Sequence, residues 1–108
     1  MAWEEWRSPI QEGHWTDQDG RRWTRRGRGG IGPKAARRLL ARSDVRVHLL
    51  YLWYEDRDIP VAERQQFWEQ VEPYLEGKAG SRGDLTEFTA AEFRSDDGHT
   101  LLLFEKEC

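Results

Sequence analysis

Apolar and polar residues alternate over residues 45–54 in the way that a β-strand requires. Every second residue from Val45 to Trp53 is apolar, and Leu50 and Leu52 make the other face partly apolar too. A strand that is apolar on both faces lies inside a sheet. We therefore expect this segment to be the central strand.

Two further alternating regions predict hairpins. In the first, His14–Thr16 and Arg22–Thr24 flank the pair Asp19-Gly20, and glycine accepts the positive φ that hairpin turns need. Trp15 and Trp23 would then be neighbours across two strands. In the second, residues 85–93 and 100–105 flank a turn at residues 95–98, and the apolar run 101–104 indicates burial on both faces.

Helical periodicity follows two prolines. From Pro33 to about Arg42, two alanines and two leucines fall on one face and the basic residues on the other. A second helix is predicted from Pro60, after a turn at residues 56–60, and Pro73 should kink or restart it near Glu72.

The predicted order of elements is β-β-α-β-α-β-β. This order indicates an α+β fold, with a mostly antiparallel sheet packed on two helices. The chain has 108 residues, close to the commonest domain size, so we expect one domain over residues 1–108. Within it we expect a frayed start (1–12), a basic hairpin-loop-helix segment (13–42) and an acidic β-α-β-β segment (45–106).

Composition limits the setting of the protein. The single cysteine, Cys108, excludes an intramolecular disulfide and a thiolate metal cluster within one chain, so we expect a reducing, cytoplasmic environment. The first eight residues lack the pattern of a secretory signal, and no stretch approaches the apolar length of a membrane span. We therefore expect no membrane association.

Positive charge is concentrated between Arg21 and Arg46. This basic segment holds ten arginine or lysine side chains and one acid, Asp44, although the whole chain has a formal net charge of −3. A surface of this kind attracts a polyanion. The hypothesis requires that these side chains face water, and pairing with acids of the same chain would contradict it.

Within this segment, residues 30–40 (Gly-Ile-Gly-Pro-Lys-Ala-Ala-Arg-Arg-Leu-Leu) resemble the second half of a helix-hairpin-helix DNA-binding motif. The resemblance implies that Gly30 and Gly32 let the backbone approach a phosphate, which the amides at the helix start contact without reading base sequence. It also favours DNA over RNA. The alternative is a loop whose glycines simply permit a tight start to the helix.

The function that we expect is a small non-catalytic module that binds nucleic acid through phosphates. Trp15 and Trp23 lie beside the basic residues and are either stacking surfaces for bases or core residues. The predicted nucleic-acid-binding residues are Arg21, Arg22, Trp23, Arg25, Arg26, Arg28, Gly30, Gly32, Lys34, Arg37, Arg38 and Arg42.

A second hypothesis remains open. The arginines could pair with acids of the chain itself, for which Glu63, Glu69, Glu72 and Glu76 are candidates. Alternatively, the acidic and basic parts could meet a partner protein or a second copy in a homodimer, as an inhibitor, antitoxin or accessory subunit would.

Catalytic and metal-binding sites are not predicted. His14, His48 and His99 lie on separate predicted strands, away from any cluster with metal-ligand spacing. We expect His14 and His99 at the surface and His48 packed in a strand. Residues 55–58 lack the glycine of a calcium loop and are more typical of a solvated turn. The sequence therefore implies neither a catalytic residue nor a cofactor.

Overall fold

The structure is a computed structural model that describes residues 7–51, 55–75 and 88–106. Its centre is a mixed sheet of six strands in the order β1-β2-β5-β6-β3-β4. The β3–β6 pair is parallel and the other four pairs are antiparallel. The strands are β1 (His14–Thr16), β2 (Arg22–Arg25), β3 (Val45–Tyr51), β4 (Glu55–Asp58), β5 (Phe88–Ser95) and β6 (Thr100–Lys106).

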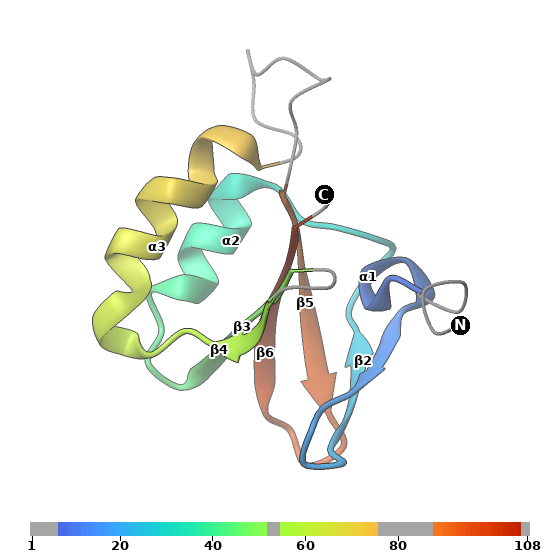
Figure 1. Cartoon of the computed structure of the whole chain (residues 1–108). Helices are drawn as coiled ribbons and strands as arrows, with labels where there is room; N and C mark the ends of the chain where they lie inside the picture. Colours follow the sequence, from blue (N-terminus) through green and yellow to red (C-terminus); the bar gives the residue numbers. More distant parts are fainter. Residues whose placement is uncertain (1–6, 52–54, 76–87, 107–108) are drawn as a thin grey trace.

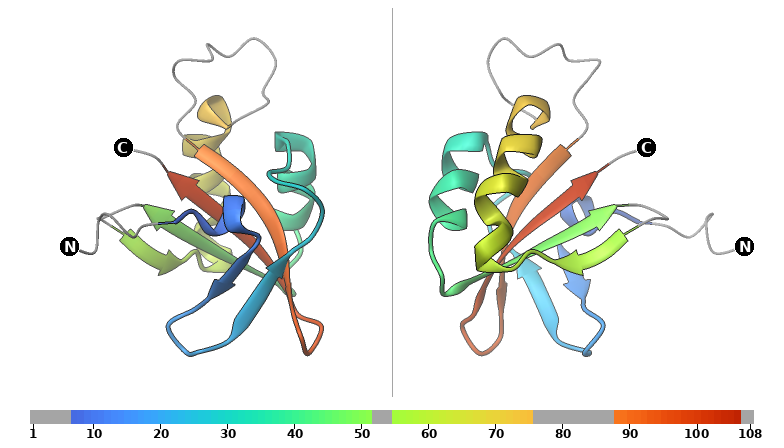
Figure 2. Two further views of the ribbon diagram at one scale, coloured as in Figure 1. Left: turned by 90° about the vertical axis from the view of Figure 1, so that its right-hand side faces the viewer. Right: turned by 60° about the vertical axis from the view of Figure 1, so that its left-hand side comes forward.

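Two helices cover one face of this sheet (Figures 1 and 2). They are α2 (Pro33–Leu40) and α3 (Arg64–Val71), and the latter lies between the 3₁₀ turns η2 (Val61–Glu63) and η3 (Glu72–Tyr74). The core beneath them includes Leu39, Val47, Trp68, Leu102 and Phe104. We call this side of the sheet the helix side.

The opposite face buries a second core. Trp23, Phe93, Leu101 and Leu103 form it, together with Ile10 of the short helix α1 (Pro9–Glu12). The sheet is therefore apolar on both faces at its middle strands, which explains why β6 reads as a continuous hydrophobic run.

The predicted fold class is confirmed, because the chain forms a single compact α+β domain. The first hairpin forms with Trp15 directly opposite Trp23, and Gly20 has a φ of +84° in its turn. Helix α3 gives way to the 3₁₀ turn η3 at Glu72, directly before Pro73, where the kink was predicted. β3 is an interior strand, as predicted, but β5 and β6 occupy the centre of the sheet instead.

Two predictions of local structure were wrong. Residues 56–60 were expected to be a turn, but Glu55–Asp58 is the edge strand β4, paired with β3. Residues 1–12 were expected to be a frayed start, but within the described part of this range Pro9–Glu12 is helix α1. The buried Glu105 fixes this helix to β6, because it accepts hydrogen bonds from the Ser8 hydroxyl (2.6 Å) and the Ile10 N–H (2.8 Å).

A buried arginine fixes the end of α2. Arg64 donates hydrogen bonds to the carbonyl oxygens of Leu40 (3.2 Å), Arg42 (2.8 Å) and Val45 (2.5 Å). Carbonyl groups at a helix C-terminus carry partial negative charge, so the guanidinium complements them. Burial lowers the pKa of Arg64.

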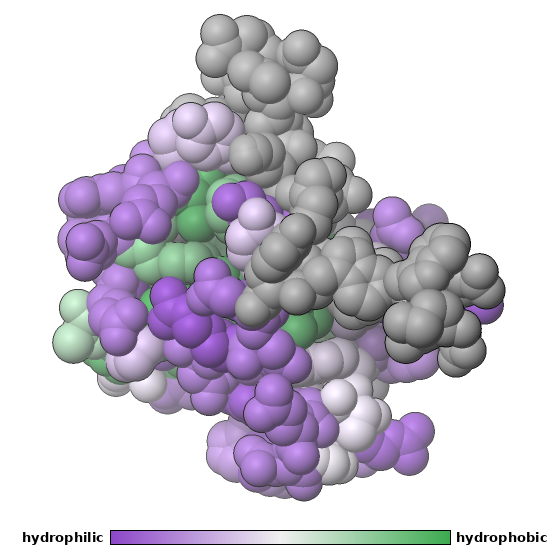
Figure 3. Space-filling model, viewed as in Figure 1, coloured by the Kyte–Doolittle hydropathy of each residue, from purple (hydrophilic) through white to green (hydrophobic). Residues whose placement is uncertain are grey.

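Hydrophilic residues cover most of the described surface in the view of Figure 3. Among the residues that the structure describes, no helix combines the length and the apolarity that crossing a membrane requires. The residues at 52–54 and 85–87, which were predicted to extend two strands, lie outside the described residues, as do Glu76 and Cys108.

Candidate nucleic-acid interface

The structure divides the ten basic side chains of the segment from Arg21 to Arg46 into two groups. Four of them form ion pairs with carboxylates, and Arg25 donates to backbone carbonyls instead. The other five have no hydrogen-bond or ion-pair partner among the described residues. These unpaired side chains are Arg22, Arg28, Lys34, Arg37 and Arg38.

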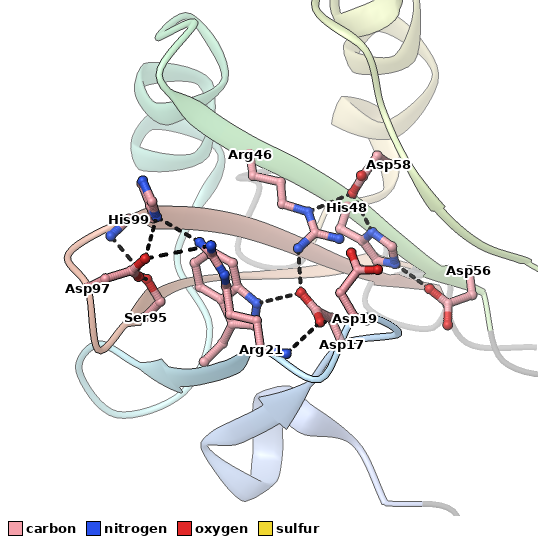
Figure 4. A network of polar contacts seen from close by, with 11 residues as sticks. Asp17, Asp19, Arg21, Arg46, His48, Asp56, Asp58, Ser95, Asp97 and His99 are labelled. Carbon is pink, nitrogen blue, oxygen red and sulfur yellow. Dashed lines mark hydrogen bonds and ion pairs between the residues drawn. The ribbon is translucent and has the colours of Figure 1, made fainter.

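Arg46 is the most firmly paired of the group (Figure 4). Its guanidinium lies 2.6 Å from Asp17 Oδ2 and 2.9 Å from Asp58 Oδ1. Burial raises the pKa of Asp17, but hydrogen bonds from the Trp23 indole, Arg46 and two backbone N–H groups outweigh it, so the pKa lies well below its ordinary value. The positive charge of Arg46 is therefore matched within the fold.

Arg21 is engaged in the same region. One guanidinium nitrogen lies 2.7 Å from His99 Nδ1 and another 3.6 Å from Asp97 Oδ2. Arg21 and Arg46 line an open pocket of about 430 Å³, together with Asp17, Asp58 and His99. Because carboxylates already surround both arginines, this pocket does not offer free positive charge to an anion.

Three other arginines have distinct roles. Arg25 is half-buried and donates to the carbonyl oxygens of Ile10 and Gln11, so it holds the C-terminal part of α1 against β2. Arg26 lies 3.6 Å from Glu92, and Arg42 forms two hydrogen bonds with Asp44, at 3.1 and 2.7 Å. The last pair is exposed and local, so it adds little to stability.

The unpaired side chains of α2 lie together. Lys34, Arg37 and Arg38 are exposed and are spaced three and four residues apart, so they are neighbours on one helix surface. Arg28, also exposed, lies in the loop that leads to this helix. The loop and the outer face of α2 are thus the part of the predicted interface whose basic side chains have no partner among the described residues.

The first turn of α2 has one feature that favours binding of an anion, because its N–H groups lack a side-chain cap. Gly32 is its N-cap, with φ −80° and ψ 175°, and provides no side-chain hydrogen bond to the first helical N–H groups. A Cβ at this position would meet nothing within 4 Å, so the chain itself does not require glycine there. In contrast, Gly27 and Gly29 have φ of +77° and +101°, a conformation that favours glycine. Gly30 is exposed in the same loop.

Trp23 cannot serve as a stacking surface in this structure. Only 1% of its surface is exposed, and its indole N–H donates to Asp17 at 3.1 Å. Trp15 is half-buried and packs against the His48 ring, with 4.8 Å between ring centroids. Both tryptophans are therefore core residues, the alternative that the sequence left open.

Two of the acids that were candidates to pair with the basic segment have other partners. Glu63 instead pairs with Arg57 of β4 (3.4 Å), and Glu69 accepts a hydrogen bond from Gln65 (3.1 Å). The carboxylates that do pair with the segment come from loops and from other strands: Asp17, Asp44, Asp58, Glu92 and Asp97. Only Asp44 lies close to its partner in the sequence.

The histidines lie where the sequence predicted, but one of them has an unexpected environment. His14 and His99 are exposed, whereas His48 is 4% exposed. Its Nδ1 lies 2.7 Å from Asp58 Oδ1, and its Nε2 contacts Asp56. Both ring nitrogens therefore face carboxylate oxygens, and neither is free for a substrate.

No group of three or more histidine, cysteine or acidic side chains within the described ranges has an arrangement that could hold a metal ion. Comparison with protein-family models, with curated proteins and with solved structures gave no match to this chain.

Proposed function

We propose that the protein binds nucleic acid through backbone phosphates, using the loop around Arg28 and the outer face of α2. The observation that carries this proposal is the group formed by Arg28, Lys34, Arg37 and Arg38. These side chains have no carboxylate partner among the described residues, although the chain as a whole has more acids than bases. Unpaired exposed cations on one helix face favour a polyanion as ligand.

The mode of binding follows from the residue types. Arginine and lysine contact phosphate oxygens, and such contacts position a protein on nucleic acid without reading base sequence. The uncapped start of α2 at Gly32 adds backbone N–H groups with partial positive charge. We therefore infer little base specificity, no chemistry at this surface, and DNA as the first ligand to test.

The experiment is a titration of a fluorescent DNA duplex, and of one of its single strands, over a range of salt concentrations. The logarithm of the affinity should fall linearly with the logarithm of salt concentration, with a slope of about −0.9 per neutralised phosphate for duplex and about −0.7 for single strand. Arg37→Ala with Arg38→Ala should reduce the duplex slope by about 1.8, since two such contacts are lost.

The matched control is Arg7→Ala with Arg57→Ala. It removes the same charge from exposed positions away from α2, and its slope should equal that of the unaltered protein. Absence of binding at low salt would overturn the proposal. The partner-protein hypothesis would then be tested by charge reversal at Glu63 and Glu69.

A further inference from the structure

Part of the helix side of the sheet is not covered by a helix. Trp23 points to the core of the opposite side, and side chains alternate along a strand, so Arg22 and Thr24 lie on the helix side. The same alternation places Glu92 and Arg94 of β5 on the helix side, in line with Ala90 of the helix-side core. In Figure 1 the ends of β2 and β5 near the turns extend beyond α2 and α3.

Register brings the basic residues of the two strands together. Thr24 is the direct partner of Arg94, and the Arg26 N–H donates to the Glu92 carbonyl oxygen at 2.7 Å. Arg94 therefore lies between the positions of Arg22 and of Arg26, the residue directly after β2, and extended chain separates these two by about 13 Å. Three arginines thus follow this uncovered strip of the sheet.

One carboxylate is shared among the arginines here. The hydrogen bond to Asp44 contributes most to the raised pKa of Arg42, and the charge of Glu92 also contributes. Glu92 itself lies 3.6 Å from Arg26 and 4.0 Å from Arg94. Both distances exceed those of charge-assisted hydrogen bonds, which are about 2.7–2.9 Å. The side chains of Arg26, Arg42 and Arg94 are 53%, 51% and 47% exposed, whereas that of Glu92 is 23% exposed.

This strip is continuous with the surface of α2. Arg42 follows directly after α2, whose last turn holds Arg37 and Arg38, and it is close enough to Glu92 to be influenced by its charge. At the other end, Arg22 lies beside a pocket that Asp19 and Asp96 also line, so negative charge limits the basic surface there.

We propose that Arg26 and Arg94, which share Glu92, form a second phosphate-binding surface that extends the α2 interface across the uncovered strip of β2 and β5. This inference rests on the proposed function and identifies further residues for it. The ligand is a nucleic-acid strand, because planar guanidinium groups bind phosphate oxygens in a bidentate manner. Glu92 holds the arginines in place when the surface is empty and competes with phosphate for them.

Two substitutions with opposite effects test the inference. Arg94→Gln should weaken duplex binding and reduce the magnitude of the salt slope by about 0.9, since one phosphate contact is lost. Glu92→Gln should tighten binding, because a competing carboxylate is removed. Arg57→Gln is the matched control, since it also removes one exposed arginine that pairs with acids, but on the edge strand β4. Thermal unfolding of each variant checks that the fold is intact.

The outcomes separate the two proposals. If the unaltered protein binds and the double variant of Arg37 and Arg38 weakens binding, but Arg94→Gln and Glu92→Gln match Arg57→Gln, the second surface is overturned and the proposed function stands. If the unaltered protein binds neither duplex nor single strand, both proposals are overturned. Binding of poly-glutamate without binding of DNA also overturns both, and indicates an acidic protein partner.

Discussion

Asp17 and Arg46, 29 positions apart in the chain, form an ion pair of 2.6 Å that joins the β1–β2 turn to β3. Asp17 is almost fully buried and also accepts hydrogen bonds from the Trp23 indole and from the N–H groups of Asp19 and Arg21. One carboxylate therefore organises the turn, the packing of Trp23 and the orientation of Arg46.

Asp17→Asn should destabilise the protein. The amide keeps the shape of the side chain but removes its charge and one acceptor oxygen, so the Trp23 indole or Arg46 loses an ionised partner. We expect the free energy of unfolding at pH 7 to fall by about 1–3 kcal/mol. Urea unfolding followed by tryptophan fluorescence measures this change. Asp96→Asn, in an exposed turn, is the control and should leave stability unchanged.

The same variant should alter the pH dependence of stability. The pKa of Asp17 is lower in the folded state than its ordinary value, so its stabilising effect is complete above about pH 5 and is lost as the pH falls through about 4 and below. The free energy of unfolding of the unaltered protein should therefore fall more steeply between pH 5 and pH 2 than that of Asp17→Asn. Equal slopes would contradict the assignment.

Arg64→Met should destabilise the connection between α2 and β3. Methionine retains an apolar stem, but the carbonyl groups of Leu40, Arg42 and Val45 lose their donor. We expect a loss of about 1–3 kcal/mol in the free energy of unfolding, measured by urea titration. Arg57→Met, at an exposed position, should change it by less than about 0.5 kcal/mol. Similar losses in the two variants would show that the buried hydrogen bonds contribute little.

Two glycines of the loop before α2 should respond differently to substitution. Gly29 has a φ of +101°, so Gly29→Ala should cost about 1–2 kcal/mol of stability. Gly32 has an ordinary φ and open space at its Cβ, and serine is a good N-cap, so Gly32→Ser should increase stability by a few tenths of a kcal/mol. Thermal unfolding measures both.

Gly32→Ser also tests whether a phosphate contacts the backbone at the start of α2. The serine hydroxyl would accept a hydrogen bond from the same N–H groups and compete with the anion. We expect weaker DNA binding together with higher stability. Unchanged affinity would exclude the backbone contact, while the contribution of Arg37 and Arg38 would be judged from their own variants.

Elements with a strong local pattern could be predicted from the sequence. The alternation over β3, the apolar stripe of α2 and the Asp19-Gly20 turn each depend on neighbouring residues, and each was found. Strand β4 was missed because all four of its residues are charged. It is held as an edge strand partly by contacts of Asp56 and Asp58 with the buried His48, which no local pattern reveals.

The candidate site was only partly visible for a similar reason. Sequence located the basic residues, but their pairing depends on which acids the fold brings near them. Asp17 is distant in sequence from Arg46, and Glu92 is distant from Arg26. Arg94 was missed because its neighbours on β2 precede it by about 70 residues, and only the register of β2 with β5 places them together.

Strand order also has a consequence for synthesis on the ribosome. β6 is the last of the six strands along the chain, yet it pairs with β5 on one side and with β3 on the other. Until residues 100–106 leave the exit tunnel, the backbone hydrogen bonds that join the β1-β2-β5 part of the sheet to the β3-β4 part through β6 cannot form. The six-stranded sheet is therefore completed only after β6 has been synthesised, and until then the unpaired edges of β3 and β5 are exposed to aggregation.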